Sequence, residues 1–183
     1  MRLYHTGRQE IRRPDVCYGR KNADFGQGFY MTAQEDFACR WARQRKGEDT
    51  VLNTYDLDLS GLAVRRLARD ESWFDYIFAN RASKPDAFPE ADVILGPIAN
   101  DTIYDTYGII TSGFLSRETA LQLLLIGPEY EQIVLKTEKA AGQLQWLSAR
   151  VLAPEEISSW RETVSREEQA FQELFAARLQ QLL

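Results

Sequence analysis

The sequence holds few of the residues on which several large enzyme classes depend. His5 is the only histidine, and Cys17 and Cys39 are the only cysteines among 183 residues. So few cannot build a histidine-rich or cysteine-built metal site, and no HExxH helix or GxSxG nucleophile elbow occurs. A Ser-His-Asp or Cys-His arrangement would have to use His5. We therefore expect no metal and no disulfide framework.

Long apolar runs and the common phosphate-binding motifs are also missing. No uninterrupted apolar segment approaches the roughly 20 residues that cross a bilayer, and the N-terminus lacks the apolar core of a secretory signal. There is no P-loop and no full GxGxxG fingerprint. These absences predict a cytoplasmic protein with reduced thiols and no membrane partner. The net charge of −5 argues against broad adhesion to nucleic acid, but it is compatible with a local basic patch.

The composition is that of a folded protein. Hydrophobic residues make up 44% and charged residues 27% of the chain, which is enough for an ordinary globular core. We expect one domain at residues 1–152, followed by a C-terminal amphipathic helical extension at residues 153–183. Ser165 and Glu168 form a capping box within the extension, so it contains either one kinked helix or two separate helices.

Short strands and short helices are scattered along the chain, which predicts an α+β fold. Strands are expected at residues 3–5, 29–31, 50–59, 62–66, 92–97, 131–136 and 147–152, where apolar residues alternate or cluster. Helices are expected at residues 33–45, 73–80, 102–107, 117–126 and 139–144, and from Pro154 onward. Their expected N-caps include Thr32, Ser72, Asp101 and Ser116.

The most informative stretch is Asp24–Thr32, with the sequence DFGQGFYMT. Gly26 and Gly28 permit backbone angles and close approaches that other residues do not. The apolar residues 29–31 suit a short buried strand. Thr32 then begins a helix, with Glu35 completing a capping box. A glycine-containing loop, a strand and a capped helix in this order predict one wall of a pocket.

Three short segments in chain order carry a further signal. The first is Tyr4-His5-Thr6-Gly7, and the second is Gly26–Thr32, followed by Trp41 eleven residues after Tyr30. The third is Glu131-Gln132-Ile133-Val134-Leu135. Together they resemble the motifs of the ADP-ribosyltransferase superfamily, in the branch of diphtheria-type toxins and poly-ADP-ribose polymerases. In the first segment the two small residues are exchanged in order relative to the superfamily pattern.

The resemblance spans residues 2–152, although only these three segments carry it. More narrowly, the DFGxGFY sequence and the helix with Trp73 resemble a small bacterial family within the superfamily. The resemblance implies split mixed β-sheets with short helices, NAD as a substrate, and transfer of ADP-ribose to a macromolecular acceptor. The superfamily includes bacterial toxins, so an antitoxin or another protein docked on the C-terminal helices is an expected partner.

The resemblance also implies a role for each residue at the site. His5 would hydrogen-bond the adenosine ribose, and the Thr6 backbone would hold the nicotinamide amide. Tyr30 and Trp41 would sandwich the nicotinamide ring, while Gly28 would leave room for the ligand. Arg20 or Lys21 would contact the pyrophosphate. The carboxylate that stabilises the oxocarbenium-like transition state, and serves as a general base, would be Glu131.

The assignment of the carboxylate depends on which face of the strand borders the pocket, because successive strand residues face opposite ways. Glu131 and Gln132 therefore cannot both face the pocket, and we slightly favour Glu131. If Gln132 faces the pocket, the protein binds NAD without efficient transfer or uses another residue such as Asp101. A non-catalytic NAD-binding or protein-interaction module is accordingly the alternative function.

Each residue also has an ordinary structural interpretation. Tyr30 and Trp41 suit core packing, and Glu131 suits a surface position. Trp73, Asn80 and Arg81 form a cluster that either contacts substrate or belongs to an aromatic helix packed on the sheet, and we favour the second. The order of the three motifs is what favours the functional interpretation.

Overall fold

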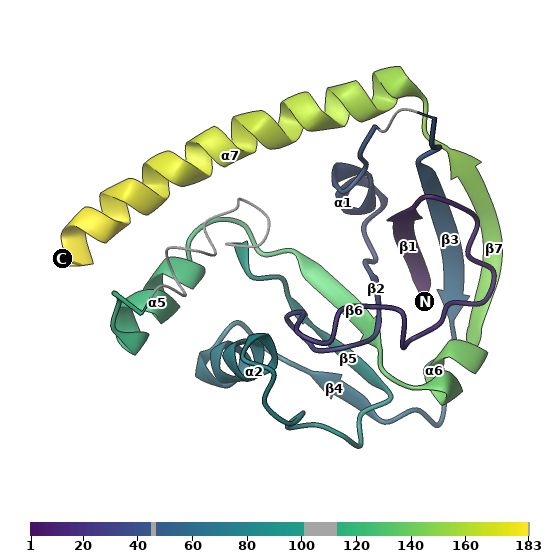
Figure 1. Ribbon diagram of the computed structural model, residues 1–183, viewed down its shortest axis with the longest axis horizontal. Coiled ribbons are helices and arrows are strands. Elements are labelled where there is room, and N and C mark those ends of the chain that lie inside the picture. The colour runs from purple at the N-terminus through teal and green to yellow at the C-terminus, as the bar shows by residue number, and fades with distance from the viewer. Residues whose placement is uncertain (45–46, 101–112, 183) are drawn as a thin grey trace.

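The computed structural model describes residues 1–44, 47–100 and 113–182, and it shows a mixed α+β fold with two sheets and a C-terminal helix (Figure 1). The strands are β1 (Arg2–Gly7), β2 (Phe29–Met31), β3 (Val51–Leu57), β4 (Val64–Arg66), β5 (Val93–Pro97), β6 (Glu131–Leu135) and β7 (Leu144–Val151). The helices are α1 (Glu35–Arg40), α2 (Glu71–Arg81), α5 (Arg117–Leu124), α6 (Glu138–Gly142) and α7 (Pro154–Leu182). The α+β prediction is confirmed at this level.

In the described part of the chain, the two sheets meet at one backbone bridge, between Tyr4 and Thr32. One sheet has the order β1-β3-β7 and the other the order β2-β6-β5-β4, and only β4 and β5 pair in parallel. Between them, Tyr4 N donates to Thr32 O over 2.8 Å and Thr32 N donates to Tyr4 O over 3.1 Å. The bridge brings the end of β2 beside the middle of β1, which is where the first two sequence motifs meet.

The core is divided by the four-stranded sheet, as the alternation of β6 shows. Ile133 and Leu135 pack in a cluster with side chains from the three-stranded sheet, such as Leu3 and Tyr55. Val134 points to the other face and joins a cluster built on helices α2, α5 and α7. Because strand side chains alternate between faces, one short apolar strand serves both clusters.

Helix α1 differs from the prediction in length and in its cap. It covers six residues instead of 33–45, and its N-cap is Gln34, which makes no capping hydrogen bond through its side chain. The predicted capping box of Thr32 and Glu35 is wrong, because Thr32 is held extended by its bridge to Tyr4. Its hydroxyl instead accepts a hydrogen bond from Gln34 N over 3.2 Å.

One other cap and one strand boundary also need correction. The N-cap of α2 is Asp70, whose carboxylate accepts from Trp73 N over 3.1 Å, instead of Ser72. The predicted cap at Ser116 is confirmed. Strand β7 begins at Leu144, earlier than predicted, because α6 already ends at Gly142. The helix expected after Asp101 lies outside the described residues.

The C-terminal extension is one helix of 29 residues, α7, so the predicted capping box at Ser165 and Glu168 is wrong. Figure 1 shows α7 running along one side of the molecule from the end of β7 to α5. Ile157 packs near α1, while Phe171 and Phe175 are buried in the cluster of α2 and α5. The helix thus contributes to the core. None of the described helices is both long enough and apolar enough to cross a membrane.

Candidate functional site

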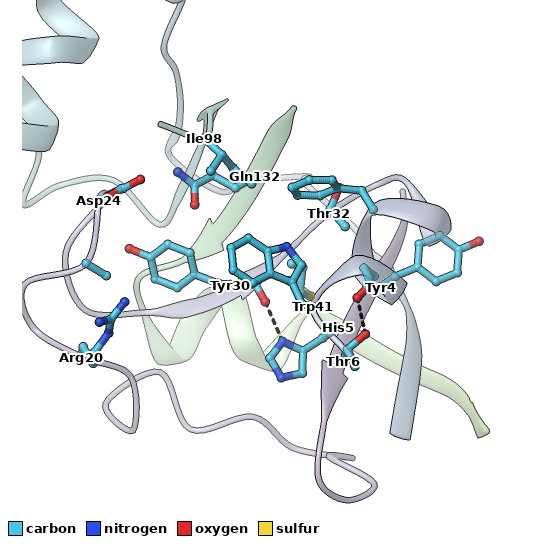
Figure 2. Close-up of a pocket in the computed structure, with 14 residues that line it drawn as sticks. Tyr4, His5, Thr6, Arg20, Asp24, Tyr30, Thr32, Trp41, Ile98 and Gln132 are labelled. Carbon is cyan, nitrogen blue, oxygen red and sulfur yellow. Dashed lines mark hydrogen bonds between the residues drawn. The ribbon is translucent and has the colours of Figure 1, made fainter. Parts of the chain in front are cut away.

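A cavity of about 410 Å³ opens beside the bridge between the two sheets. Side chains from β1, β2, α1, β6 and the loop before β2 line it (Figure 2). Six of the residues predicted for the site are among them: His5, Thr6, Arg20, Tyr30, Trp41 and Gln132. The structure therefore brings together residues that are up to 127 positions apart (His5 to Gln132). Glu131, Gly28 and Lys21 are not part of the lining.

His5 is held by the backbone of β2. Its Nδ1 lies 2.8 Å from Tyr30 O, and because a carbonyl only accepts, Nδ1 carries the proton. Burial lowers the pKa of the imidazole below 6.5, an effect larger than the opposing one of this hydrogen bond. His5 is thus neutral at pH 7, with the lone pair on Nε2. Among the described residues no hydrogen-bond partner of Nε2 is present, so Nε2 can accept a hydrogen bond from a hydroxyl group of a ligand.

Thr6 presents its backbone to the cavity. In an antiparallel pair, the N–H and C=O groups of successive residues point to opposite sides of the strand, and those of every second residue point to the same side. Tyr4 directs both groups away from β3, to Thr32. The N–H and C=O of Thr6, two residues on, therefore point the same way, beyond the reach of β2. The Thr6 hydroxyl donates to Ala38 O over 2.6 Å and fixes α1 against β1.

The loop before β2 is fixed by side chains that bind its carbonyl groups. Asp24 O accepts from Asn80 Nδ2 over 3.0 Å, and Phe25 O accepts from Lys136 Nζ. Gly26 sits at a φ of 72°, which favours glycine. Phe25 is fully buried in the core cluster of α2. The loop is therefore bound to α2 and to the end of β6.

Tyr30 joins this loop to the cavity. Its hydroxyl donates to Gly26 O over 2.6 Å and accepts from Phe25 N over 3.0 Å. Its ring lines the cavity (Figure 2). Burial is the main cause of a strongly raised pKa of the hydroxyl, so Tyr30 stays protonated. The hydroxyl of Tyr30 therefore supports the loop, while the residue also borders the cavity.

Asp24 and Arg81 form a buried ion pair at the edge of the cavity. Arg81 Nη2 and Nε lie 2.8 and 2.9 Å from Asp24 Oδ1, and the two side chains are 4% and 9% exposed, Arg81 first. Asp24 lines the cavity and Arg81 does not. The favoured interpretation of the helix cluster is confirmed: Trp73 is buried and donates to Pro97 O over 2.8 Å, and Asn80 and Arg81 hold the loop.

Trp41 lies across the cavity from this loop. It is the C-cap of α1 rather than a residue within a long helix, and it is 40% exposed. Its ring packs edge-on against Phe37, with centroids 6.0 Å apart, and Phe37 stacks on Tyr130 at 4.4 Å. Figure 2 shows Trp41 and Tyr30 projecting into the same space from α1 and β2.

The slight preference for Glu131 as the residue facing the pocket is wrong. Gln132 lines the cavity and is 6% exposed, with Nε2 directed toward Pro97 O at 3.4 Å, whereas Glu131 is exposed at the start of β6. The register of β2 and β6 gives the reason. Tyr30 pairs with Val134, so the residue two positions before Val134 faces the same side as Tyr30.

The predicted role of Gly28 in leaving room for a ligand is not supported by its position. A Cβ at Gly28 would lie 2.5 Å from Val134 Cγ1 and 2.6 Å from Leu135 O. The missing side chain therefore allows close approach to β6 and not to the cavity. Arg20 is exposed and lines the cavity, and its contact with a pyrophosphate stays a prediction. No group of three or more His, Cys, Asp or Glu residues that could hold a metal is found in the described part of the chain.

Asp24 lines the cavity but was not among the residues predicted for the site. The residue was visible in the DFG motif, but its partner Arg81 lies 57 positions away at the end of α2. A contact of that separation leaves no trace in local periodicity. A weaker signal was present in the sequence, because Asn80 and Arg81 are polar residues at the end of an otherwise aromatic helix.

The chain matches the sequence model of a known family. The sequence model of a family described as "Protein of unknown function (DUF3990)" matches residues 1–146, which is 146 of 183 residues. The match includes every residue that lines the cavity and ends within β7, so α7 lies beyond it. No curated protein matches the chain.

Proposed function

We propose that this chain, which belongs to the DUF3990 family of proteins of unknown function, is an ADP-ribosyltransferase with NAD as its substrate. The observation that carries the proposal is the convergence of His5, Thr6, Tyr30 and Trp41 on one cavity. These residues come from two of the three motifs that resemble the ADP-ribosyltransferase superfamily. The two sheets joined at β1 and β2 are compatible with the split sheets of that superfamily.

In this proposal the nicotinamide ring lies between Tyr30 and Trp41, which both line the cavity. It is cationic in NAD, and a cation over an aromatic face gains about 0.5–2 kcal/mol, more where water is excluded. The carboxamide of nicotinamide has one acceptor oxygen and one donor NH2 group. The N–H and C=O of Thr6, both directed away from β3, are the complementary pair.

The remaining parts of NAD have partners on the same cavity. His5 Nε2, neutral and free to accept, is suited to a ribose hydroxyl. Arg20 is suited to the pyrophosphate, because a guanidinium binds phosphate oxygens with charge-assisted hydrogen bonds. The amide of Gln132 both donates and accepts, so it can fix a ribose hydroxyl near the bond that is cleaved.

A neutral amide at Gln132 limits the chemistry of β6. An amide does not take up a proton near pH 7, so Gln132 does not act as the general base, and Glu131 is exposed outside the lining. Bond cleavage to an oxocarbenium-like ribose needs orientation and charge stabilisation more than a base. We place Gln132 as a residue that orients the ribose, with a macromolecule as the acceptor.

The decisive experiment measures release of nicotinamide and transfer of label from NAD labelled in its adenine ring, with a cell lysate as the source of acceptor. We expect labelled macromolecule, with free nicotinamide in equal amount. The absence of both, together with no NAD binding at millimolar concentration, would overturn the proposal.

A matched pair of variants tests the assignment on β6. Gln132→Ala removes the amide from the cavity and is expected to slow nicotinamide release at least about tenfold, the effect of losing a positioned hydrogen bond. Glu131→Ala changes an exposed neighbour on the same strand and is expected to leave the rate within about twofold. The reverse order of effects would restore Glu131 as the functional residue.

A second candidate function is a non-catalytic NAD-binding or protein-interaction module. The observation that favours it is Gln132 in place of a carboxylate on the cavity face of β6. Such a protein binds NAD but releases no nicotinamide. A protein partner, such as an antitoxin, would dock on the exposed face of α7, because Phe171 and Phe175 on its other face are already buried in the core.

A further inference from the structure

We propose that Asp24 supplies the negative charge that stabilises the ribose cation in the cavity. This inference rests on the proposed function and extends it, because β6 places no carboxylate in the lining. Among the described residues that line the cavity, Asp24 is the only Asp or Glu. It belongs to the loop that ends at Tyr30, on a different strand from the carboxylate that the motif resemblance implies.

The ion pair with Arg81 keeps Asp24 charged and in place. Arg81 is 4% exposed and holds Asp24 Oδ1 through both Nη2 and Nε, at 2.8 and 2.9 Å. A guanidinium stays protonated under all relevant conditions, so it favours the ionised carboxylate. The described lining of the cavity contains Asp24 and does not contain Arg81. The negative member of the pair therefore borders the ligand space, and Arg81 is a positioning residue.

Asp24 also lies on the correct side of the cavity. Figure 2 shows the Asp24 carboxylate and the Gln132 amide on the same side of the Tyr30 ring. Asp24 is close enough to Tyr30 to contribute to its raised pKa, although burial is the larger cause. If the nicotinamide ring stacks on Tyr30 and Gln132 orients the ribose, the carboxylate lies near the ribose.

The charge matters at one step of the reaction. The bond between ribose C1′ and the nicotinamide nitrogen breaks, and its electron pair leaves with nicotinamide. The positive charge thereby moves from the pyridinium ring to ribose C1′ and its ring oxygen. The acceptor nucleophile then bonds to C1′ and loses its proton to water. A fixed carboxylate near the ribose stabilises the transition state more than bound NAD, which is the condition for catalysis.

Side chains of α2 and of the residue after β6 fix the backbone of this loop. Asn80, beside Arg81 on α2, binds the Asp24 carbonyl, and Lys136 binds the next carbonyl along the chain. Asp24 thus has both its backbone and its side chain fixed by α2. A carboxylate held in this way needs little reorganisation as charge develops in the ligand.

The test compares Asp24→Asn with Asp92→Asn. Asp92 is a matched control, because its side chain is 10% exposed and lies 2.9 Å from Lys139 Nζ, but it is not in the cavity lining. Asp24→Asn is expected to slow nicotinamide release about 100-fold, as for loss of one strong electrostatic contact in an active site, and to change nicotinamide affinity by less than about threefold. Asp92→Asn is expected to lower the melting temperature while release stays within about twofold.

Three results would overturn the inference. If Asp24→Asn releases nicotinamide at the wild-type rate, the role of Asp24 is overturned and the proposed function is left intact. Wild-type protein that binds NAD but releases no nicotinamide overturns the inference together with the transferase. If Asp24→Asn does not fold, Asp24→Glu replaces it, since it keeps the charge but shifts it by one methylene. Release within about twofold of wild type in that variant contradicts a fixed carboxylate, and a loss of about tenfold or more supports it.

Discussion

The two walls of the cavity are built in different ways. On the side of Tyr30, the loop and strand have their polar groups bound by partners from α2 and β6, and the Tyr30 hydroxyl itself closes two hydrogen bonds. On the side of Trp41, the indole ends a helix of six residues and is 40% exposed. Its ring is held by an edge contact with Phe37.

This difference indicates which wall is fixed before a ligand arrives. A wall whose backbone is bound at successive carbonyls loses little freedom on binding, so contacts to it are available at low entropic cost. Trp41, at the end of a short helix with few bonds, belongs to the less stable part of the fold. We therefore expect changes on the Tyr30 side to affect folding, and changes at Trp41 to affect ligand affinity.

The largest effect is expected from Gly28→Ala, on the fixed wall. The new methyl group would lie 2.6 Å from Leu135 O, a backbone atom of β6 that cannot move without loss of strand pairing. Overpacking of this kind costs about 1–3 kcal/mol, and more where the backbone must shift. Urea unfolding followed by circular dichroism measures the loss of stability.

Gly142→Ala is the control for Gly28→Ala, because it makes the same change in α6, where a Cβ meets no heavy atom within 4 Å. We expect it to be neutral or to stabilise by up to about 1 kcal/mol. Equal stability of Gly28→Ala and wild type would contradict the close approach of β2 to β6.

Tyr30→Phe separates the two roles of the tyrosine. The ring remains for stacking, but Gly26 O and Phe25 N lose their partner, which costs about 1–3 kcal/mol when such groups are buried. We expect lower stability in urea, with nicotinamide affinity within about threefold of wild type by calorimetry. A loss of affinity without a loss of stability would mean that the hydroxyl serves the ligand and not the loop.

Trp41→Ala is expected to show the opposite pattern. The side chain is partly exposed, so its removal should cost less than about 1 kcal/mol of stability. Loss of one stacking face should lower the affinity for nicotinamide or NAD by about 10-fold or more, since such stacking contributes about 1–3 kcal/mol. Trp41→Phe, which keeps an aromatic face, should recover most of the affinity. A Trp41→Ala protein with wild-type affinity would exclude the aromatic sandwich.

The sequence predicted the site residues that belong to short motifs and missed those whose position depends on distant contacts. Tyr30, Trp41, His5 and Thr6 follow from short motifs with fixed spacing, and all of them line the cavity. The choice between Glu131 and Gln132 depended on the register of β2 against β6, which local sequence does not contain. The Tyr30 and Val134 pairing settles it. Asp24 was missed for a similar reason, because its burial depends on Arg81.

The fold was predictable to the same extent. The positions of the strands follow from apolar runs and agree with the structure to within a few residues. The predicted start of α1 failed because the bridge to Tyr4 outweighs the capping tendency of Thr32. The capping box at Ser165 failed because buried Phe171 and Phe175 hold α7 as one helix against the core. In both cases tertiary contacts override a local signal of about 1 kcal/mol.

The smallest effect concerns pH and the neutral state of His5. Burial lowers the pKa of His5 below 6.5, so its Nε2 stays an acceptor at and above that pH. The affinity for ADP-ribose, measured by calorimetry, should therefore be constant from about pH 8 down to 6.5 and should fall only at lower pH. Stability should change in the same direction. Because the folded-state pKa is the lower one, the unfolded chain binds the proton first, and stability falls as the pH drops below 6.5.

His5→Asn provides the control for this profile. An amide can donate to Tyr30 O in place of Nδ1 and does not titrate. The affinity of the His5→Asn variant for ADP-ribose should be weaker than that of wild type but should not fall further as the pH drops below 6.5. A wild-type affinity that instead rises as the pH falls from about 8 to 7 would show that the charged form of His5 binds the ligand better. It would then donate from Nε2 instead of accepting, and the ligand group beside it would be an acceptor such as a phosphate oxygen.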